Sequence, residues 1–436
     1  MQIQNNLIQI EPPGSLVMHP SVTEGAMAEG FWSGNRSVFL IRDYRVYIAS
    51  RFLWGLGQHI QTIAIAWLVY ELTGDPFSLG LIGLAAFVPV IALSLISGPV
   101  ADRYDRRMII VVCSLAMALA SAAVIAMMLA GVIHAQRVWP LYVVVTIFGA
   151  ARAFSGPAGQ ALVMSLVPRE DYASAAAWNN TVNQSATLLG PSIGGLLFPL
   201  GANAPFFTAC ACLSGGAVLA WMLGVRKASE AKPPVTLAML VAGYQFIWRT
   251  PVVLGTVTLD LVAVLFAGAT ALLPVFAKDI FETGPWGLGV LRSMPSVGAL
   301  AAALFIANFS LRWHVGRTMF AAVAIYGFAT IGFGLSTNIY AGMMCLIVLG
   351  AADMISVVIR QTLIQTETPD EMRGRTIAVH NILSGTSNQL GEFESGTLAA
   401  FIGVVPTVTI GGVIAVLASL LWMRMFPTLR DRTKFS

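Results

Sequence analysis

Residues 189–195 read Leu-Gly-Pro-Ser-Ile-Gly-Gly, and residues 390–396, which lie 201 positions later (390 minus 189), read Leu-Gly-Glu-Phe-Glu-Ser-Gly. The same offset, with no gap, relates Gly149-Ala150-Ala151 to Gly350-Ala351-Ala352. A constant offset over this length predicts a chain built from two related halves. The second copy alone carries two carboxylates, in a segment that is otherwise apolar enough to cross a bilayer.

The composition places the chain in a membrane. Of its 436 residues, 57% are hydrophobic and 11% are charged, and the mean hydropathy is +0.77. A soluble domain carries about 25% charged residues, so folding alone would not hide this much apolar surface from water. We identify about twelve apolar runs, each long enough at about 20 residues to span the bilayer as a helix.

The runs form two groups of six around a basic segment with a proline pair. We predict an all-α integral membrane protein with twelve transmembrane helices in two pseudo-symmetric six-helix bundles. The expected parts are an N-terminal tail (1–45), a first bundle (46–224), a central loop (225–250), a second bundle (251–425) and a C-terminal tail (426–436). Within the loop, Leu237 to Trp248 is apolar enough to lie along the membrane interface.

The excess of basic residues marks topology. The net charge of +4 would suit a nucleic-acid partner, but Arg103, Arg106 and Arg107 stand together between spans two and three. On the opposite side of the predicted membrane, the only basic residues are Arg137 and Lys278. The positive-inside rule therefore predicts an inner or plasma membrane protein with both termini in the cytoplasm. We expect a lipid bilayer and no nucleic acid as its surroundings.

The sequence contains no pattern for a cofactor, a metal or an enzyme. The four cysteines all lie in predicted spans and are interpreted as buried thiols; they are Cys113, Cys210, Cys212 and Cys345. The spans show no cluster of metal-ligating residues and no nucleophile motif. A phosphate-binding Gly-x-x-x-x-Gly-Lys-Ser/Thr loop is also missing, so we do not expect ATP hydrolysis.

The segment between spans two and three carries a specific motif. It runs from Gly98 to Arg107 as Gly-Pro-Val-Ala-Asp-Arg-Tyr-Asp-Arg-Arg. A glycine there permits close helix packing, and a membrane-surface Asp needs a partner or a helix N-terminus. The segment resembles the loop 2–3 signature of the major facilitator superfamily, Gly-x-x-x-Asp-Arg-x-Gly-Arg-Arg/Lys. The matching residues are Gly98, Asp102, Arg103, Arg106 and Arg107.

The motif departs from the superfamily pattern at Asp105, where the pattern has Gly. The Asp-Arg-Arg ending resembles the form that this motif takes in the branch of drug and secretion effluxers that includes the enterobactin exporter. Span five adds a second resemblance, to the antiporter motif Gly-Pro-x-x-Gly-Gly, in a helix that can kink and pack tightly. The matching residues are Gly190, Pro191, Gly194 and Gly195. Ala186 stands where the longer motif has Gly, and plain helix packing is the alternative.

A third resemblance lies just before span eleven. Residues 369–375 read Pro-Asp-Glu-Met-Arg-Gly-Arg and are similar to the Pro-x-Glu-x-Arg-Gly-Arg segment of the same branch, through Glu371, Arg373 and Arg375. The resemblance implies that Asp102 meets the positive end of the helix starting near Thr376 when the cytoplasmic side is closed. This contact would latch one conformational state.

Ionisable residues within spans are costly and are therefore candidate site residues. Arg152 and Asp353 occupy equivalent repeat positions, since 353 minus 152 is 201. The resemblance implies that helices one, four, seven and ten line a central cavity, which would place these two residues on opposite walls. The alternative is a structural salt bridge between the bundles. Arg360 shares the helix face of Asp353 two turns further along, and Asp260 in span seven is another cavity candidate.

Three more candidates for proton coupling lie in spans one and eleven. His59 can titrate near neutral pH, although a lone membrane histidine is more often a hydrogen-bonded packing residue. Glu392 and Glu394 point about 200° apart on a helix and do not face the same cavity. Each is a candidate carrier of a proton, with Arg292 as a counter-ion across the bundle interface.

The resemblance implies a secondary active exporter that binds an amphipathic small molecule, siderophore or drug-like, near the bilayer midplane. Rocking of one bundle on the other would alternate access, with proton influx as the driving force and a monomer as the expected unit. Two alternatives stay open: a proton-coupled importer of a small solute and a non-transporting receptor with the same fold. A membrane-embedded enzyme is not expected.

Overall fold

The computed structural model describes residues 38–224, 237–308 and 314–433, and the described part is built from helices. The predicted tail up to residue 37 and loop residues 225–236 lie outside the described residues. The first half contains α2 (Arg42–Thr73), α3 (Pro76–Arg103), α4 (Arg106–Leu129), α5 (Trp139–Leu166), α6 (Tyr172–Leu197) and α7 (Ala204–Trp221). The second half contains α9 (Pro251–Phe266), α11 (Gly284–Asn308), α12 (Val315–Gly334), α13 (Ile339–Glu367), α14 (Asp370–Ile402) and α15 (Val404–Met425).

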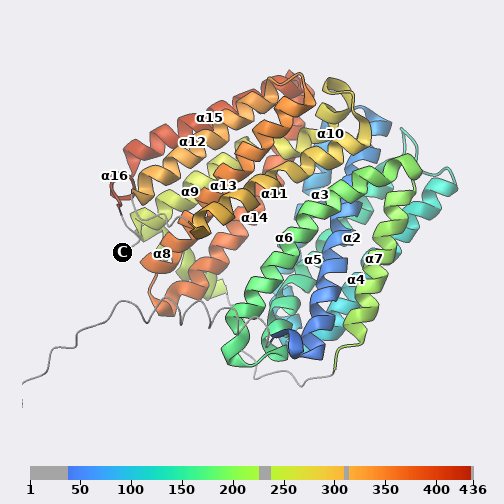
Figure 1. Ribbon diagram of the computed structural model, residues 1–436, viewed down its shortest axis with the longest axis horizontal. Helices are drawn as coiled ribbons and strands as arrows, with labels where there is room; N and C mark the ends of the chain where they lie inside the picture. The colour runs from blue at the N-terminus through green and yellow to red at the C-terminus, as the bar shows by residue number, and fades with distance from the viewer. Residues whose placement is uncertain (1–37, 225–236, 309–313, 434–436) are drawn as a thin grey trace, which may run out of the picture.

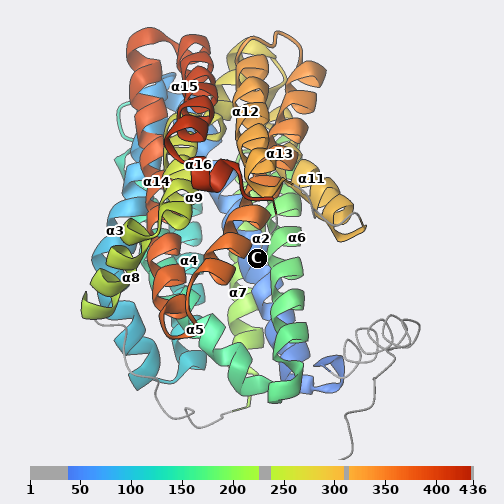
Figure 2. The ribbon, with the colours of Figure 1, turned by 90° about the vertical axis from the view of Figure 1, so that its left-hand side faces the viewer.

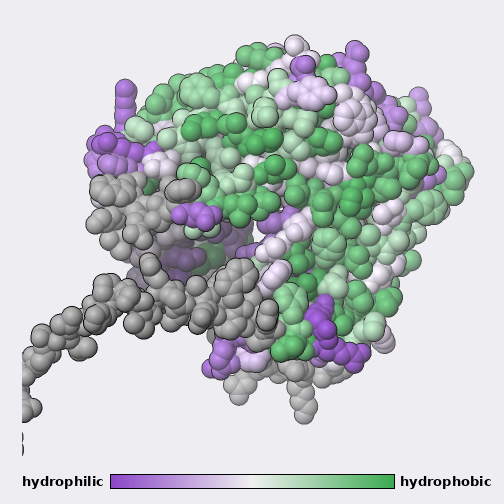
Figure 3. Space-filling model, in the orientation of Figure 1, coloured by the Kyte–Doolittle hydropathy of each residue, from purple (hydrophilic) through white to green (hydrophobic). Residues whose placement is uncertain are grey.

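The helices form two bundles, one from each half, which stand side by side in Figure 1 and overlap in the turned view of Figure 2, where the second bundle is nearer the viewer. Apolar side chains cover broad areas of both bundles (Figure 3). Ten helices of the described chain are long and apolar enough to cross a membrane. The predicted two-bundle architecture of a multi-pass membrane protein is confirmed.

Two long helices fall outside this set of ten, namely α6 and α14. They have 26 and 33 residues, enough at about 1.5 Å per residue to cross a bilayer. Each packs against the opposite bundle, α6 on α11 and α14 on α3. Their polar side chains are compatible with a membrane because the other bundle shields them from lipid. These two helices occupy equivalent positions in the sequence repeat.

The bundles touch most closely at two glycine pairs. A Cβ added to Gly195 of α6 would lie 2.8 Å from Cα of Gly289 in α11. A Cβ added to Gly396 of α14 would lie 2.6 Å from Cα of Gly80 in α3. Gly195 and Gly396 are repeat equivalents, since 396 minus 195 is 201. A glycine that both copies retain therefore forms a crossing between the bundles in each half.

Further contacts between the bundles gather at the same end of the molecule, where α2 ends and α3 begins. The Tyr70 hydroxyl donates a hydrogen bond to the Asp279 carboxylate, and Lys278 Nζ donates to the Glu71 carbonyl at 3.4 Å. We call this the closed end. The bundles diverge toward the opposite end, where α3 ends and α14 begins (Figure 1), and we call this the open end.

Span seven is not the continuous helix expected at 251–276. Helix α9 ends at Phe266, and Gly268 has the non-helical dihedral angles φ −70° and ψ 52°. The chain continues through a 3₁₀ turn (η3, Ala269–Leu272), a short turn (α10, Leu273–Val275) and a π-helical turn (η4, Phe276–Ile280). Arg292 Nη1 donates to the freed carbonyl of Thr270 at 2.6 Å. Broken membrane helices are tolerated where other groups satisfy the backbone in this way.

The apolar part of the central loop forms helix α8 (Leu237–Arg249), which packs on α14 and α9. The Tyr244 and Trp248 rings stack with centroids 5.8 Å apart, and both side chains are exposed. Gly243 lies against the backbone of α14, where an added Cβ would be 2.8 Å from the Arg375 carbonyl oxygen. Helix α8 therefore braces the first turns of α14.

We predict that Gly195→Ala destabilises the protein by about 1–3 kcal/mol, the usual range for overpacking. The neighbours of the new methyl group are backbone atoms of Pro285 and Gly289, which do not rotate away. Gly156→Ala in α5 is the matched control, because nothing lies within 4 Å of its added Cβ. The control should gain about 0.5–1 kcal/mol from helix propensity. Thermal unfolding of the purified proteins compares them, and equal unfolding temperatures would contradict the crossing.

Candidate functional site

Two neighbouring cavities between the bundles share lining residues. The larger, of about 470 Å³, has one wall from α3 and the other from α14. The smaller, of about 220 Å³, is bordered by α2, α3, α5, α11 and α14. Arg152, Gln389 and Glu392 line both cavities, which makes them neighbouring parts of one central site. A recess between the bundles is visible with hydrophilic side chains in Figure 3.

Arg152 extends from α5 into this central site and is exposed there. No carboxylate of the described residues forms an ion pair with it. Its repeat equivalent, Asp353, does not line either cavity. The structure therefore does not bring Arg152 and Asp353 together on opposite walls, because Asp353 faces the interior of the second bundle.

Glu392 and Glu394 point in different directions, as the helix geometry requires. Glu392 lines the central site and lies 3.7 Å from Arg292 of α11. Glu394 lines neither cavity and accepts a hydrogen bond from Ser395 at 3.4 Å. The expected role of Arg292 as a counter-ion across the bundle interface needs correction. Its partner Glu392 belongs to the same bundle, and the pair sits at the junction with the first bundle.

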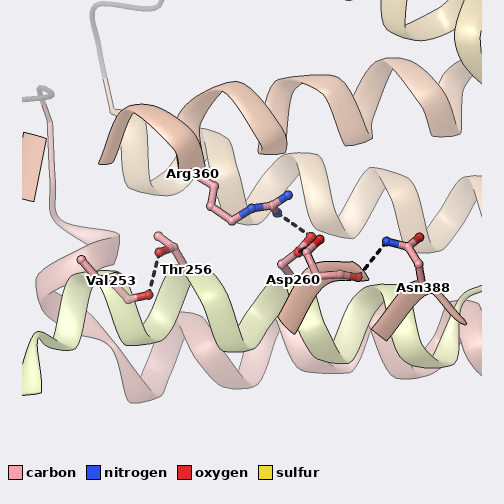
Figure 4. Close-up of polar contacts among 6 residues, drawn as sticks. Val253, Thr256, Asp260, Arg360 and Asn388 are labelled. Atoms are coloured by element: carbon pink, nitrogen blue, oxygen red, sulfur yellow. Dashed lines mark hydrogen bonds and ion pairs between the residues drawn. The ribbon is translucent and has the colours of Figure 1, made fainter. Parts of the chain in front are cut away.

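A second group of charges lies inside the second bundle. Arg360 of α13 and Asp260 of α9 form an ion pair of 2.5 Å (Figure 4), and both residues are buried, with exposures of 4% and 5%. Ser384 donates a longer hydrogen bond of 3.5 Å to Asp260. Asp353 lines a pocket of about 10 Å³ with Asp260 and Tyr326, close to the smallest space that can hold one water molecule. Asp353 forms no ion pair among the described residues.

His59 lines the smaller cavity and is only partly exposed. Its Nε2 lies 3.2 Å from the hydroxyl oxygen of Thr187 in α6. An added Cβ on Gly190 would lie 2.5 Å from the His59 Cβ, so the span-five motif packs directly on this part of α2. The sequence left two roles open for His59, hydrogen-bonded packing and proton coupling. The structure gives it a hydrogen-bonded packing position and also access to the cavity.

The span-five motif has two packing directions. Gly190 and Gly194 face α2 of their own bundle, whereas Gly195 faces α11 of the other. A Cβ added to Gly289 would lie 2.7 Å from the carbonyl oxygen of Pro191, so this proline also borders the crossing. Helix α6 runs through Pro191 without interruption.

The loop 2–3 motif forms a local cluster at the open end. Asp102 lies 3.8 Å from Arg106, and Arg107 donates to the Leu223 carbonyl at 2.5 Å. Asp105 accepts a hydrogen bond from the backbone N–H of Arg107 at 2.9 Å and so caps helix α4. This cap explains why Asp replaces the usual Gly, since Asp is among the best N-cap residues.

Gly98 does not pack closely here, contrary to the sequence-based expectation. Nothing lies within 4 Å of a Cβ added at this position. Arg103, in the last turn of α3, is exposed. The physical reason is the divergence of the bundles at the open end, which leaves the end of α3 without a neighbour from the second bundle.

The loop before span eleven also needs a correction. Helix α14 begins at Asp370, six residues before the expected start near Thr376 (376 minus 370). Arg373 pairs with Asp370 at 2.7 Å, and Arg375 Nη1 lies 3.5 Å from the Met372 sulfur. Glu371 is exposed in the first turn. Asp370 and Glu371 therefore already occupy the N-terminus of α14, where Asp102 was expected to bind. The groups available to a carboxylate such as Asp102 are instead the arginines.

The sequence reading missed the polar face of α14 that lines the larger cavity. Amide and hydroxyl side chains recur along this face, at Asn381, Thr386, Asn388 and Gln389. The available signal was the low hydropathy of span eleven compared with its neighbours.

Comparison with known families is decisive at this point. The family model described as transmembrane secretion effector matches residues 37–433, nearly the whole described chain. The chain belongs to this family of the major facilitator superfamily. It is a membrane transporter and not an enzyme, as its family and relatives establish.

Two relatives with assigned functions are a multidrug efflux pump and an enterobactin exporter. The multidrug efflux pump Tap of Mycolicibacterium fortuitum is 28% identical over 368 residues, which cover 81% of this chain and 88% of that protein. The enterobactin exporter EntS of Citrobacter koseri is 25% identical over 401 residues, covering 91% and 92%. Among solved structures, the nucleoside transporter NupG matches with a TM-score of 0.71 at 13% identity, covering 88% of this chain and 99% of that one. This last similarity shows a shared superfamily fold.

We predict that removing one partner of the Asp260–Arg360 pair is more damaging than removing both. Arg360→Met leaves a buried carboxylate without its cation and should cost about 3–5 kcal/mol, whereas Asp260→Leu with Arg360→Met should cost less. The exposed pair of Arg430 and Asp431 is the control, and Asp431→Asn should not change stability. Thermal unfolding of the purified variants measures this. The single variant Asp260→Leu is measured as well. A double variant whose loss of stability equals the sum of the losses in the two single variants would refute the coupling.

Proposed function

We propose that this transporter exports an amphipathic small molecule across the plasma (inner) membrane in exchange for protons, by alternating access. The observation that carries the proposal is the central site, which lies between two bundles that are held together at one end and apart at the other. Its total size of several hundred Å³ is typical of sites for drug-sized ligands. The efflux relatives support export as the direction, and a monomer is sufficient for this mechanism.

The positive-inside rule supports a cytoplasmic position for the open end. Arginines are concentrated there on several connections, including Arg103, Arg107, Arg169 and Arg373. With both termini in the cytoplasm, the structure would represent the state that receives substrate from inside the cell. Export then requires closure of this end and opening of the closed end.

The loop motif supplies a means of closure. In the open state Asp102 is held by Arg106 at 3.8 Å, a weak contact for a charged pair. Closure would bring the end of α3 to the first turns of α14, where Arg373 and Arg375 are available. We propose that Asp102 then pairs with one of these arginines.

The proton route is proposed to run through Asp353. This carboxylate is inside the second bundle and forms no ion pair among the described residues, so it exchanges a proton without breaking a salt bridge. Glu392, in contrast, is paired with Arg292. The Asp353 pocket borders the break in span seven, because Tyr326 donates a hydrogen bond to the Ala267 carbonyl at 3.2 Å. A change of charge at Asp353 therefore acts beside a flexible point of the helix.

Transport into inverted membrane vesicles with an acidic lumen tests the proposal. A panel of siderophores, antibiotics and amphipathic dyes should include a compound that accumulates in the lumen, and a protonophore should abolish its accumulation. Movement in the opposite direction would support the importer instead. Binding without any flux would support a receptor.

We expect Asp353→Asn to abolish accumulation driven by the pH gradient while exchange of labelled for unlabelled substrate continues. The reason is that exchange needs the substrate site but not the proton site. Glu394→Gln, which removes a carboxylate outside the cavities, is the control and should transport as the wild type does. Normal gradient-driven transport by Asp353→Asn would exclude this residue, and Glu392→Gln would then be the next variant to measure.

We also predict that Asp102→Asn lowers the transport rate by about tenfold or more, since loss of one charged hydrogen bond costs about 1.5–3 kcal/mol. The protein should still be inserted in the membrane at normal levels. Asp105→Asn in the same loop is the matched control, because Asn also caps helices well. Wild-type flux in Asp102→Asn would rule out the latch.

A further inference from the structure

The charges that line the central site do not cancel. Among the described residues lining its two cavities, the permanently charged side chains are Arg152, Arg292 and Glu392. Arg292 and Glu392 form an ion pair, and Arg292 also donates to the Thr270 carbonyl. With two arginines and one glutamate, these described lining residues carry a net charge of +1, and of the two arginines only Arg292 forms an ion pair with Glu392.

Arg152 is placed to hold a ligand. It borders both cavities, so a molecule in either one comes within its reach. A cation facing a site between membrane helices is costly unless an anion or water compensates it. The guanidinium group offers several N–H donors in a planar fork, which suits a carboxylate, sulfonate or phenolate group.

Two side-chain acceptors in the same site also lack partners. Gln58 Oε1 and Gln389 Oε1 are buried and accept no hydrogen bond from the described residues. Both residues line the smaller cavity next to Arg152. Buried acceptors favour a ligand that brings hydroxyl or N–H donors, because leaving them unpaired costs free energy.

The α3 wall of the larger cavity is mostly apolar, with Ser94 as its polar member. Phe87, Val90 and Ile91 of α3 face the polar side chains of α14 across it. A ligand that fits both walls has an aromatic or aliphatic body on one side and polar groups on the other. The exposed arginines at the open end, such as Arg103 and Arg373, add a positive potential that attracts anions toward the entrance.

From these features we propose that the central site selects amphiphilic organic anions that carry hydrogen-bond donors, with the anionic group on Arg152. These anions are the substrate class of the proposed exporter. Their binding does not depend on the proposed function, whereas their transport rests on it. Neutral analogues bind less well because Arg152 then stays uncompensated. Cationic analogues bind least well because Arg152 repels them.

The test is equilibrium dialysis of the full-length protein in lipid nanodiscs, with empty nanodiscs subtracted. The probes are 1-hydroxy-2-naphthoate, its neutral amide 1-hydroxy-2-naphthamide, and the cation 1-naphthylmethylammonium. The acid and the amide have nearly the same shape and share the hydroxyl donor. We expect the acid to bind about tenfold or more tightly than the amide, as one charged hydrogen-bond pair provides. Equal binding of acid and amide, or tighter binding of the cation, would overturn the proposal.

Variants identify the residue responsible. Arg152→Gln should bind acid and amide equally, whereas Arg152→Lys should keep part of the preference for the acid. Glu392→Gln removes the carboxylate of the site and should raise the affinity for the acid. Arg137→Gln, in the connection between α4 and α5, is the control and should bind as the wild type does. An undiminished preference for the acid in Arg152→Gln, or a weaker affinity for it in Glu392→Gln, would contradict the assignment.

The vesicle assay separates this inference from the proposed function. Gradient-driven transport confined to neutral or cationic compounds would refute the anion preference and leave proton-coupled export standing. Anion binding that depends on Arg152, without flux of any compound, would refute export and leave the binding site standing. The comparison of acid with amide in the wild-type protein needs no substitution. It therefore decides whether the site prefers anions even if a variant fails to fold.

Discussion

The close approach of backbones at Gly195 with Gly289 and at Gly396 with Gly80 is the constraint on which the rest of the structure depends. Helices in a bilayer gain little from hiding apolar side chains, so close backbone packing is their main source of association. Because both crossings lie near the same end, the bundles are held there and separate toward the other end. The central site occupies the space that this separation creates. A methyl group at either crossing would act on the arrangement of the bundles as well as on local packing.

The charges inside the membrane are divided between two places with different partners. Asp260 and Arg360 neutralise each other within the second bundle, beside the unpaired Asp353. Arg292 and Glu392 neutralise each other at the central site and leave Arg152 uncompensated. The break in span seven connects the two places, since Tyr326 bonds to Ala267 on one side of Gly268 and Arg292 bonds to Thr270 on the other. In the proposed mechanism the proton and the substrate therefore occupy separate positions, with one irregular backbone segment between them.

Much of the fold was predictable because its signals are local or periodic. Apolar runs identify the helices, and the offset of 201 residues identifies two bundles. The start of α14 was misplaced because its first turns, from Asp370 to Arg375, are charged and look like a loop by hydropathy alone. The break in span seven was missed because residues 251–276 are predominantly apolar on both sides of it, and Gly268 is one of many glycines in the spans. For the site, the repeat identified Arg152, Asp353 and Glu392 as unusual residues but gave no information about their directions.

The sequence by itself determined the membrane location, the two related bundles and the superfamily, because composition, spacing and motif residues are properties of the chain alone. Only the tertiary structure decided which charges meet. Glu392 pairs with Arg292, Asp353 turns away from the cavity, and Arg152 forms no ion pair within the described part of the chain. The physical reason is that a side chain's partner depends on the rotation of each helix about its axis and on where helices cross. In this chain those are set by backbone contacts between residues about one hundred or more positions apart, such as Gly195 with Gly289 (94 apart) and Gly80 with Gly396 (316 apart).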